Sequence, residues 1–181
     1  MMYQYNRIRL PEKHAEPFTR SIDQSQIWGT FAALFGLLDT ERVIISHGSI
    51  EADVPTGNHL ECFSMAPTAR PTQFAPLSGE GLYVLRTFNV LEPHGEEFVE
   101  LSQSAWQTFE GDEDFVAGPK GLFRPATLDN GLVPMLLITW YDGLASWERS
   151  RTPDDNAREN FMRRRVLTES TTAIATRLVE L

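Results

Sequence analysis

The sequence has a single cysteine, Cys62, and lacks any long apolar run. One thiol can form neither a disulfide within the chain nor an all-cysteine metal site, which fits a reducing compartment. The first ten residues carry Arg7 and Arg9 among polar neighbours and do not resemble a signal peptide. The longest apolar stretches, such as residues 132–141, are too short to span a bilayer. We therefore expect a soluble, cytoplasmic protein.

Positive charge is also scarce. The chain has 16 Lys and Arg against 25 Asp and Glu, which gives a net charge of -9. A chain this acidic repels the phosphates of nucleic acids and is not drawn to an anionic membrane surface. We therefore expect neither nucleic acid nor membrane as a partner, and we predict a small-molecule ligand.

Familiar catalytic motifs are missing as well. The chain contains no H-E-x-x-H, no P-loop and no G-x-S-x-G. His59-Leu60-Glu61 has the H-x-E spacing of zinc deaminases, but the pair of downstream cysteines that such a site requires is absent. We predict no metal and no cofactor, with haem held by one of the four histidines as an alternative.

What the sequence does contain is an internal repeat. A shift of 80 positions places Tyr3 on Tyr83 and Phe18 on Phe98. The same shift matches Glu12 with Glu92, His14 with His94 and Glu16 with Glu96. Outside that register, Gly121-Leu122-Phe123 resembles Gly29-Thr30-Phe31. Self-similarity of this kind predicts two halves of one architecture.

Each half begins with the same order of predicted elements. In the first half, alternation and β-formers predict strands at residues 3–10, 28–38 and 42–47, with a helix from Pro11 after the first strand. In the second half, the matching strands are residues 83–90 and 133–141, and the helix is 92–109. The pattern predicts an α+β protein of tandem ferredoxin-like repeats whose antiparallel sheets pack into a dimeric-α/β-barrel-type architecture.

The boundary between the repeats falls near residue 80. Residues 1–80 form the first repeat, and residues 81–181 form the second, with a long C-terminal helix whose buried stripe is Leu167, Thr171, Ile174 and Leu178. Residues 49–78 are rich in Pro, Gly, Ser and Thr and cannot form a continuous helix. Such a segment is either a lid over a site or an arm that crosses the surface.

Two stretches near the C-terminus carry a family resemblance. In residues 138–151 a strand ends in an aromatic-acidic turn before Leu144-Ala145, and residues 161–165 are rich in arginine. They resemble the NIPSNAP family of the dimeric α/β-barrel superfamily. That superfamily includes cofactor-independent monooxygenases, isomerases, polyketide cyclases and haem enzymes, so the resemblance implies a fold more directly than a reaction.

Strand alternation selects the candidate ligand-binding residues. If Ile8 and Leu10 face the helices, the alternate side chains of the first strand face the barrel interior, and the repeat adds their counterparts. This inward set is Tyr5, Arg7, Arg9, Thr87 and Asn89. A buried guanidinium requires a counter-charge, so the arginines either orient an anionic ligand or pair with Asp or Glu at the barrel rim.

A candidate acid-base pair completes this site. His47 ends a strand, and histidine transfers protons near neutral pH. Tyr141 or Trp140 occupies the matching place in the second half. We therefore predict His47, Tyr141 and Arg7 as catalytic residues, with Trp140 among the ligand-binding residues; the alternative for His47 is a purely structural role.

Three functions are consistent with these features. The first is a cofactor-independent enzyme, with monooxygenase, isomerase or cyclase-like chemistry on a flat, apolar, partly anionic substrate. The second is a non-catalytic, NIPSNAP-like binding or assembly module, which predicts a barrel filled by side chains. The third is haem binding. The sheets can close within one chain or between copies, and we predict a homodimer or higher homo-oligomer.

Overall fold

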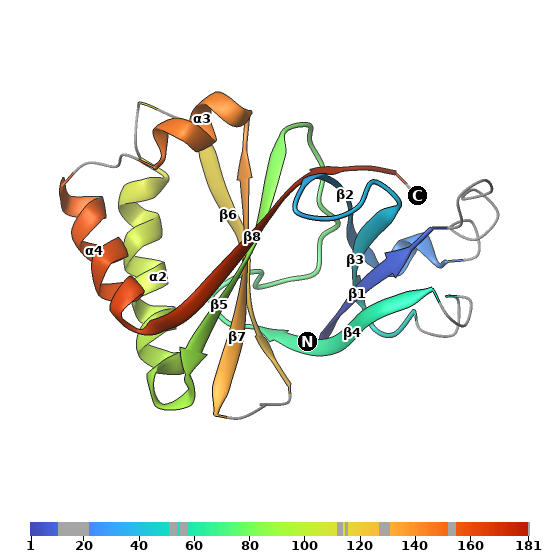
Figure 1. Ribbon diagram of the computed structural model, residues 1–181, viewed down its shortest axis with the longest axis horizontal. Helices are drawn as coiled ribbons and strands as arrows, with labels where there is room; N and C mark the ends of the chain where they lie inside the picture. Colours follow the sequence, from blue (N-terminus) through green and yellow to red (C-terminus); the bar gives the residue numbers. More distant parts are fainter. Residues whose placement is uncertain are drawn as a thin grey trace.

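The chain forms a closed barrel of antiparallel strands in the order β1-β3-β2-β8-β5-β7-β6-β4 (Figure 1). The computed structural model describes residues 1–10, 22–50, 54, 58–111, 114, 116–126, 131–151 and 155–180. The strands are β1 (Tyr3–Arg9), β2 (Ile27–Phe35), β3 (Glu41–His47), β4 (His59–Pro67), β5 (Leu82–Leu91), β6 (Ala117–Pro125), β7 (Leu132–Tyr141) and β8 (Thr168–Leu178). The α-helices described are α2 (Gly95–Phe109), α3 (Leu144–Arg149) and α4 (Asp155–Val166), and short 3-10 turns are η1 (Gln24–Gln26) and η3 (Glu92–His94).

Each half of the chain contributes four neighbouring strands. The first half gives β4-β1-β3-β2 and the second gives β8-β5-β7-β6, so the relative order is the same. The two sets join where β2 pairs with β8 and where β4 pairs with β6. The barrel therefore closes within one chain, and no second copy is needed to complete it.

Two glycines occupy matching places in these sets. A Cβ added at Gly29 would lie 2.9 Å from the ring of Phe31, and one added at Gly121 would lie 2.5 Å from the ring of Phe123. Both distances are shorter than real side-chain contacts, so any larger residue would displace the ring. In each half, the glycine leaves room for an aromatic ring to cover the strand from inside the barrel.

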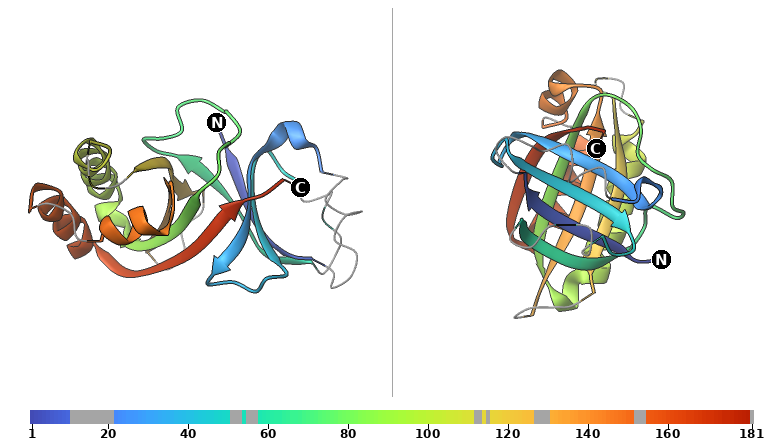
Figure 2. Two further views of the ribbon diagram at one scale, coloured as in Figure 1. Left: turned by 90° about the horizontal axis from the view of Figure 1, so that it is seen from above. Right: turned by 90° about the vertical axis from the view of Figure 1, so that its right-hand side faces the viewer.

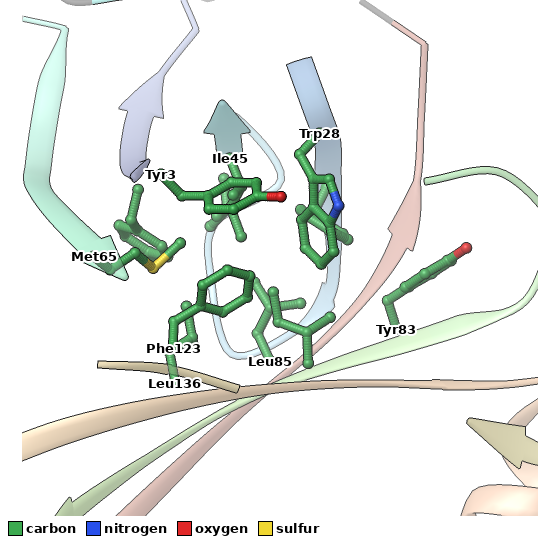
Figure 3. Close-up of a cluster of buried hydrophobic side chains, with 12 residues drawn as sticks. Tyr3, Trp28, Ile45, Met65, Tyr83, Leu85, Phe123 and Leu136 are labelled. Carbon is green, nitrogen blue, oxygen red and sulfur yellow. The ribbon is translucent and has the colours of Figure 1, made fainter. Parts of the chain in front are cut away.

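Aromatic and aliphatic side chains fill the middle of the barrel (Figure 3). The Phe123 ring lies at the centre, with its centroid 5.2 Å from that of Tyr3 and 5.4 Å from that of Trp28. Leu85 and Leu136 pack beside it from neighbouring strands of the same half, whereas Tyr3 and Trp28 come from the first half (Figure 3). These residues alternate along their strands with residues that face outward, as a barrel requires.

Residues 68–81 cross one end of the barrel. Phe74 and Leu77 pack against the core, and the backbone N–H of Leu77 donates to the carbonyl of Trp28 at 2.6 Å. The prediction that residues 49–78 are irregular throughout was wrong, because β4 lies inside that range. Strand β4 is largely exposed and lacks a clear apolar alternation, so pairing with β1 and β6 decides its conformation.

Helices α2 and α4 lie together on the outside of the sheet that contains β5 (Figure 2). The stripe predicted for α2 is buried as expected and consists of Phe98, Leu101, Ala105 and Phe109. It packs over outward-facing residues of β5 and β7 such as Phe88, Val133 and Leu137. None of the helices described is long and apolar enough to cross a membrane.

The C-terminal segment differs from its prediction. Helix α4 ends at Val166, and residues 168–178 form β8, not the end of a long helix. The segment is rich in β-branched residues, which favour strands. It also has partners on both sides, since Phe31 pairs with Leu178 and Tyr83 pairs with Thr176. The helix predicted from Pro11 lies outside the described residues.

Candidate functional site

Two cavities accompany this fold. The outer cavity, of about 690 Å³, lies between the outward face of β5 and β7 and the helices α2 and α4; its lining includes Val84, Arg86, Trp106, Tyr141, Phe161 and Arg164. The barrel-end cavity, of about 440 Å³, is lined by Tyr5, Arg7, Glu61, Phe63, Thr87 and Asn89 among others. Both volumes are within the range of about 300–1,000 Å³ typical of ligand sites.

Strand alternation places the two cavities on opposite sides of one wall. Along β5, Leu85 belongs to the barrel core and Thr87 lines the barrel-end cavity, while Arg86 and Phe88 line the outer cavity. Position 86 follows the same two-residue period as Val84 and Phe88, so its side chain emerges under the helices. The outer cavity is therefore walled by sheet on one side and by α2 and α4 on the other.

Arg86 enters the outer cavity without a counter-charge. It is half-buried, and no hydrogen bond or ion pair joins its side chain to another described residue. Its guanidinium carbon lies 6.0 Å from the ring centroid of Phe88, at the far limit of a cation–π contact. Burial lowers the pKa of Arg86, and the nearby positive charge of Arg151 lowers it further. The group still carries its charge at neutral pH.

Arg164 lies deeper, under α4, with only 7% of its surface exposed. Its guanidinium carbon is 4.8 Å from the ring centroid of Phe88, 5.2 Å from that of Phe161 and 5.5 Å from that of Phe98. It also donates to the hydroxyl of Ser102 at 3.4 Å. Burial, and then repulsion from Arg86, lowers the pKa of Arg164 to about 10. The aromatic rings offset part of the cost of burying this charge.

Tyr141 places a phenol among these cations. Burial raises its pKa, although a hydrogen bond with Ser150 and the charges of Arg86, Arg151 and Arg164 act in the opposite direction. The hydroxyl therefore stays protonated at neutral pH and can donate a hydrogen bond or a proton. A protonated phenol beside buried guanidiniums can stabilise negative charge that develops on an oxygen atom.

The barrel-end cavity brings together four of the predicted residues: Tyr5, Arg7, Thr87 and Asn89. The ring of Tyr5 stacks on Phe63 with centroids 4.7 Å apart. Asn89 Nδ2 donates to the hydroxyl of Ser170 at 2.8 Å. Burial raises the pKa of Tyr5, and the charge of Glu61 raises it further. The alternation argument therefore selected residues that do share one cavity.

The two predicted arginines in the barrel pair with Glu41. Arg7 Nη2 lies 2.7 Å from one carboxylate oxygen and Arg9 Nη2 lies 3.1 Å from the other. The carboxylate side chain is only 2% exposed. Burial alone would raise the pKa of Glu41, but the hydrogen bonds and charges of both arginines outweigh it and hold the pKa below its usual value. Of the two alternatives, pairing with an acid at the rim is the one that occurs.

The predicted pair of His47 and Tyr141 is not brought together. His47 is exposed at the barrel end that residues 68–81 cross, with its ring centroid 5.3 Å from that of Phe74. Tyr141 lines the outer cavity instead. The repeat match lies one position earlier, because Tyr83 pairs with Trp140 as Tyr3 pairs with His47. Adjacent residues of a strand face opposite sides of the sheet. The side chain of Tyr141 therefore points to the outer face of the barrel, although it was predicted to point inward.

Two other predicted residues line neither cavity. Arg9 is exposed apart from its ion pair with Glu41. Trp140 packs against the edge of the core, and its Nε1 donates to the carbonyl of Glu80 at 2.8 Å. Lys120 Nζ lies 5.1 Å from the centroid of its ring. These contacts hold the indole against residues 68–81 and the sheet, not against a ligand.

Arg86, Arg151 and Arg164 were not among the predicted site residues. A signal existed for Arg86, because it interrupts a row of apolar residues, Val84 and Phe88, on the face that packs under helices. The shift of 80 places it on Asn6, which is fully buried and whose amide has no hydrogen-bond partner among the described residues. Both halves thus carry a polar residue at the same outward position.

Comparison with known proteins supports the fold. Neither the known protein families nor the curated proteins include a match to the sequence. Similar solved structures include an anthrone oxidase-like protein, at 12% identity and TM-score 0.64 over 99% of this chain and 91% of that one. Another is a ferredoxin-fold protein from Listeria monocytogenes related to antibiotic biosynthesis monooxygenases, at 9% identity, TM-score 0.57 and coverage of 99% and 96%. A heme-degrading enzyme from Listeria monocytogenes matches at 9% identity and TM-score 0.54, covering 94% and 97%.

The chain therefore has the ferredoxin-type fold of these monooxygenase-like proteins. Identities this low show the fold and not the reaction. NIPSNAP membership, which was predicted from residues 138–151 and 161–165, stays a prediction because no family match supports it.

Haem held by a histidine does not fit either cavity. Haem iron in proteins is held by His, Cys, Met or Tyr side chains. Among the described residues that line the two cavities, none is a histidine. His47 and His59 lie on strands of the first half, and His94 lies at the start of α2, where its Nδ1 is 3.9 Å from a carboxylate oxygen of Glu97.

Proposed function

We propose that this protein is a small-molecule enzyme with monooxygenase-like chemistry, and that its site is the outer cavity. The substrate would be flat and largely apolar, with an acidic group. The observation that carries the proposal is the conjunction of an aromatic-walled volume of about 690 Å³ with buried guanidiniums and a protonated phenol. Convergent polar groups with shifted pKa values in a large apolar cavity are the usual marks of an active site.

Each group has a distinct role in this proposal. Phe88, Trp106 and Phe161 hold the flat body of the substrate. Arg86 binds the acidic group, and Tyr141 donates a hydrogen bond or proton to the oxygen on which negative charge develops. Helix α4 covers the cavity and excludes water, which strengthens these electrostatic interactions.

Replacement of Tyr141 by Phe tests the role of the phenol. Substrates would be found by screening flat phenols and the ketones that enolise to them, such as anthrone, and tested for oxygen consumption with an oxygen electrode. We expect Tyr141→Phe to lower kcat by about 100-fold with little change in KM, as for loss of a general acid. Tyr5→Phe is the matched control, because it removes a buried phenol from the barrel-end cavity, and it should leave kcat unchanged.

The opposite result would assign the active site to the other cavity. If Tyr5→Phe lowered kcat and Tyr141→Phe did not, the chemistry would belong to the barrel-end cavity with Arg7. Turnover without oxygen consumption would exclude the monooxygenase reaction and leave isomerase or cyclase-like chemistry.

A non-catalytic binding module is the second candidate. It predicts a barrel filled by side chains, and the middle of the barrel is filled in this way. It does not account for the outer cavity as a site of chemistry. Ligand binding there without turnover of any screened compound would favour this candidate.

We also propose that the halves are tandem ferredoxin-like repeats; the shared strand order and the matching Gly29 and Gly121 support this. A homodimer stays a prediction. Because the barrel closes within one chain, a dimer would form through outer surfaces and not by completing the barrel. Light scattering during gel filtration measures the mass directly.

A further inference from the structure

The charges around the outer cavity do not balance. Arg86, Arg151 and Arg164 lie close enough to shift the pKa of one phenol, and none of them forms an ion pair with a described residue. No aspartate or glutamate is among the described residues that line the cavity. The chain as a whole has 25 acidic residues against 16 basic ones, so carboxylates are not in short supply.

Other arginines of the chain show the usual arrangement. Arg70 pairs with Glu110, Arg124 pairs with Glu96, and Arg7 pairs with Glu41. The arginine side chains of these pairs are 39%, 30% and 33% exposed, so their need for a counter-charge is weaker than that of Arg164, which is 7% exposed. Arg164, the most buried of these guanidiniums, and half-buried Arg86 have no carboxylate partner in the described part of the chain.

Arg86 is the group best placed to take an anion. Arg164 has three aromatic rings and the Ser102 hydroxyl around it, which compensate part of its burial. Arg86 has the distant ring of Phe88 and the neutral phenol of Tyr141 near it. A guanidinium presents its N–H groups as a planar fork that matches the two oxygens of a carboxylate.

The walls of the cavity define the rest of the ligand. Phe88, Phe109, Leu137 and Trp106 contribute an apolar surface that a bare inorganic anion would leave uncovered. We propose that the outer cavity binds an aromatic carboxylate, with its ring between these side chains and its carboxylate on Arg86. The inference rests on the proposed function in taking the outer cavity as the site, and it names the substrate class.

Without a bound anion, the unpaired charge of Arg86 lowers the stability of the folded protein. A buried cation without a partner destabilises the folded state, and removing it in favour of an apolar side chain of similar size is often stabilising. Arg86→Met should therefore raise the melting temperature of the free protein. At the same time it should abolish binding of the carboxylate, because the charge that attracts it is gone.

Thermal unfolding with matched probes tests the proposal. At constant ionic strength and pH 7, 2-naphthoate at saturating concentration should raise the melting temperature of the wild type by about 3 °C. Its neutral isostere 2-naphthamide should have little effect, and sodium sulfate should raise the melting temperature less than 2-naphthoate does. The naphthoate shift should disappear as the pH falls below about 4, where a carboxylic acid becomes protonated.

Variants then locate the site. Arg86→Met should lose the naphthoate shift and melt higher when free. Arg163→Met is the matched control: it removes an exposed arginine from α4 outside the cavity lining and should change neither quantity. Arg86→Lys keeps the charge without the fork and should reduce the affinity for 2-naphthoate by about tenfold.

Several outcomes would overturn the proposal. These are equal shifts with naphthoate and naphthamide, no shift with naphthoate, a sulfate shift as large as the naphthoate shift, and a full naphthoate shift in Arg86→Met. The readout is binding, so it is independent of turnover. A naphthoate shift in a protein that turns over no compound would leave this inference in place and remove the proposed function.

Discussion

The two sides of strand β5 differ in packing and in charge. On the barrel side, Leu85 joins a filled core, and the nearby arginines Arg7 and Arg9 share a buried glutamate. On the outer side, Arg86 opens into a cavity of about 690 Å³ with no acidic residue in its described lining. Strand alternation separates the two environments by one residue.

The difference separates what holds the protein together from what can act on a ligand. The middle of the barrel is filled and its charges are matched, so on that side only the barrel-end cavity of about 440 Å³ leaves room for a ligand. A cavity with aromatic walls and unmatched charges lowers stability, and that loss is recovered when a suitable anion binds. The following substitutions test whether the two sides of the wall behave in this way.

Phe123→Ala should have the largest effect on stability. The ring is fully buried at the centre of the barrel, and its removal leaves a cavity that the surrounding side chains cannot fill. We expect a loss of about 4 kcal/mol in the free energy of unfolding, measured by urea denaturation. The matched change on the outer side, Phe161→Ala, should cost about 1 kcal/mol because that ring is only partly buried. Equal losses would show that the outer wall is packed as tightly as the barrel.

Glu41→Gln should have the next largest effect. The change leaves Arg7 and Arg9 without their counter-charge, but both guanidiniums reach water, so we expect a loss of about 2 kcal/mol at pH 7.

The pH dependence gives a second readout of Glu41. Its folded-state pKa is lowered, so its contribution is present above the ordinary glutamate pKa of about 4.3 and is lost as the pH falls through the folded value. The gap between wild type and Glu41→Gln should therefore close in acid, which urea denaturation at a series of pH values would show. A gap that stays constant down to pH 2 would contradict the charge explanation.

His47→Ala should have the smallest effect. The side chain is exposed, and its described contacts are the edges of Tyr3 and Phe74. We expect a change within about 0.5 kcal/mol in unfolding free energy and an unchanged kcat. A large loss of kcat with normal stability would restore His47 as a catalytic residue and weaken the case for the outer cavity.

Several features could be predicted from the sequence because they depend on local periodicity. Alternation along β1 and β5 correctly grouped Tyr5, Arg7, Thr87 and Asn89 in one cavity. The apolar stripe of α2 was also correct, since a spacing of three and four residues specifies one helix face whatever packs on it.

Other features depend on partners that are distant in the chain. Residues 168–178 have apolar spacing that fits a helix, but the free edges of β2 and β5 select a strand. The choice between Trp140 and Tyr141 depended on a register that only the pairing of β5 with β7 specifies. A register error of one residue is enough to move a side chain from one cavity to the other.

Side-chain periodicity was thus sufficient to say which residues share a face, because it follows from backbone geometry within a single strand or helix. Which face is filled and which is hollow depended on side-chain volumes from both halves meeting at Phe123, and on helices folding back over β5. Whether an arginine is paired depended on whether a carboxylate such as Glu41, distant in sequence, lies opposite it. Packing and charge balance depend on all the residues that surround a side chain, and only the tertiary structure determines which residues those are.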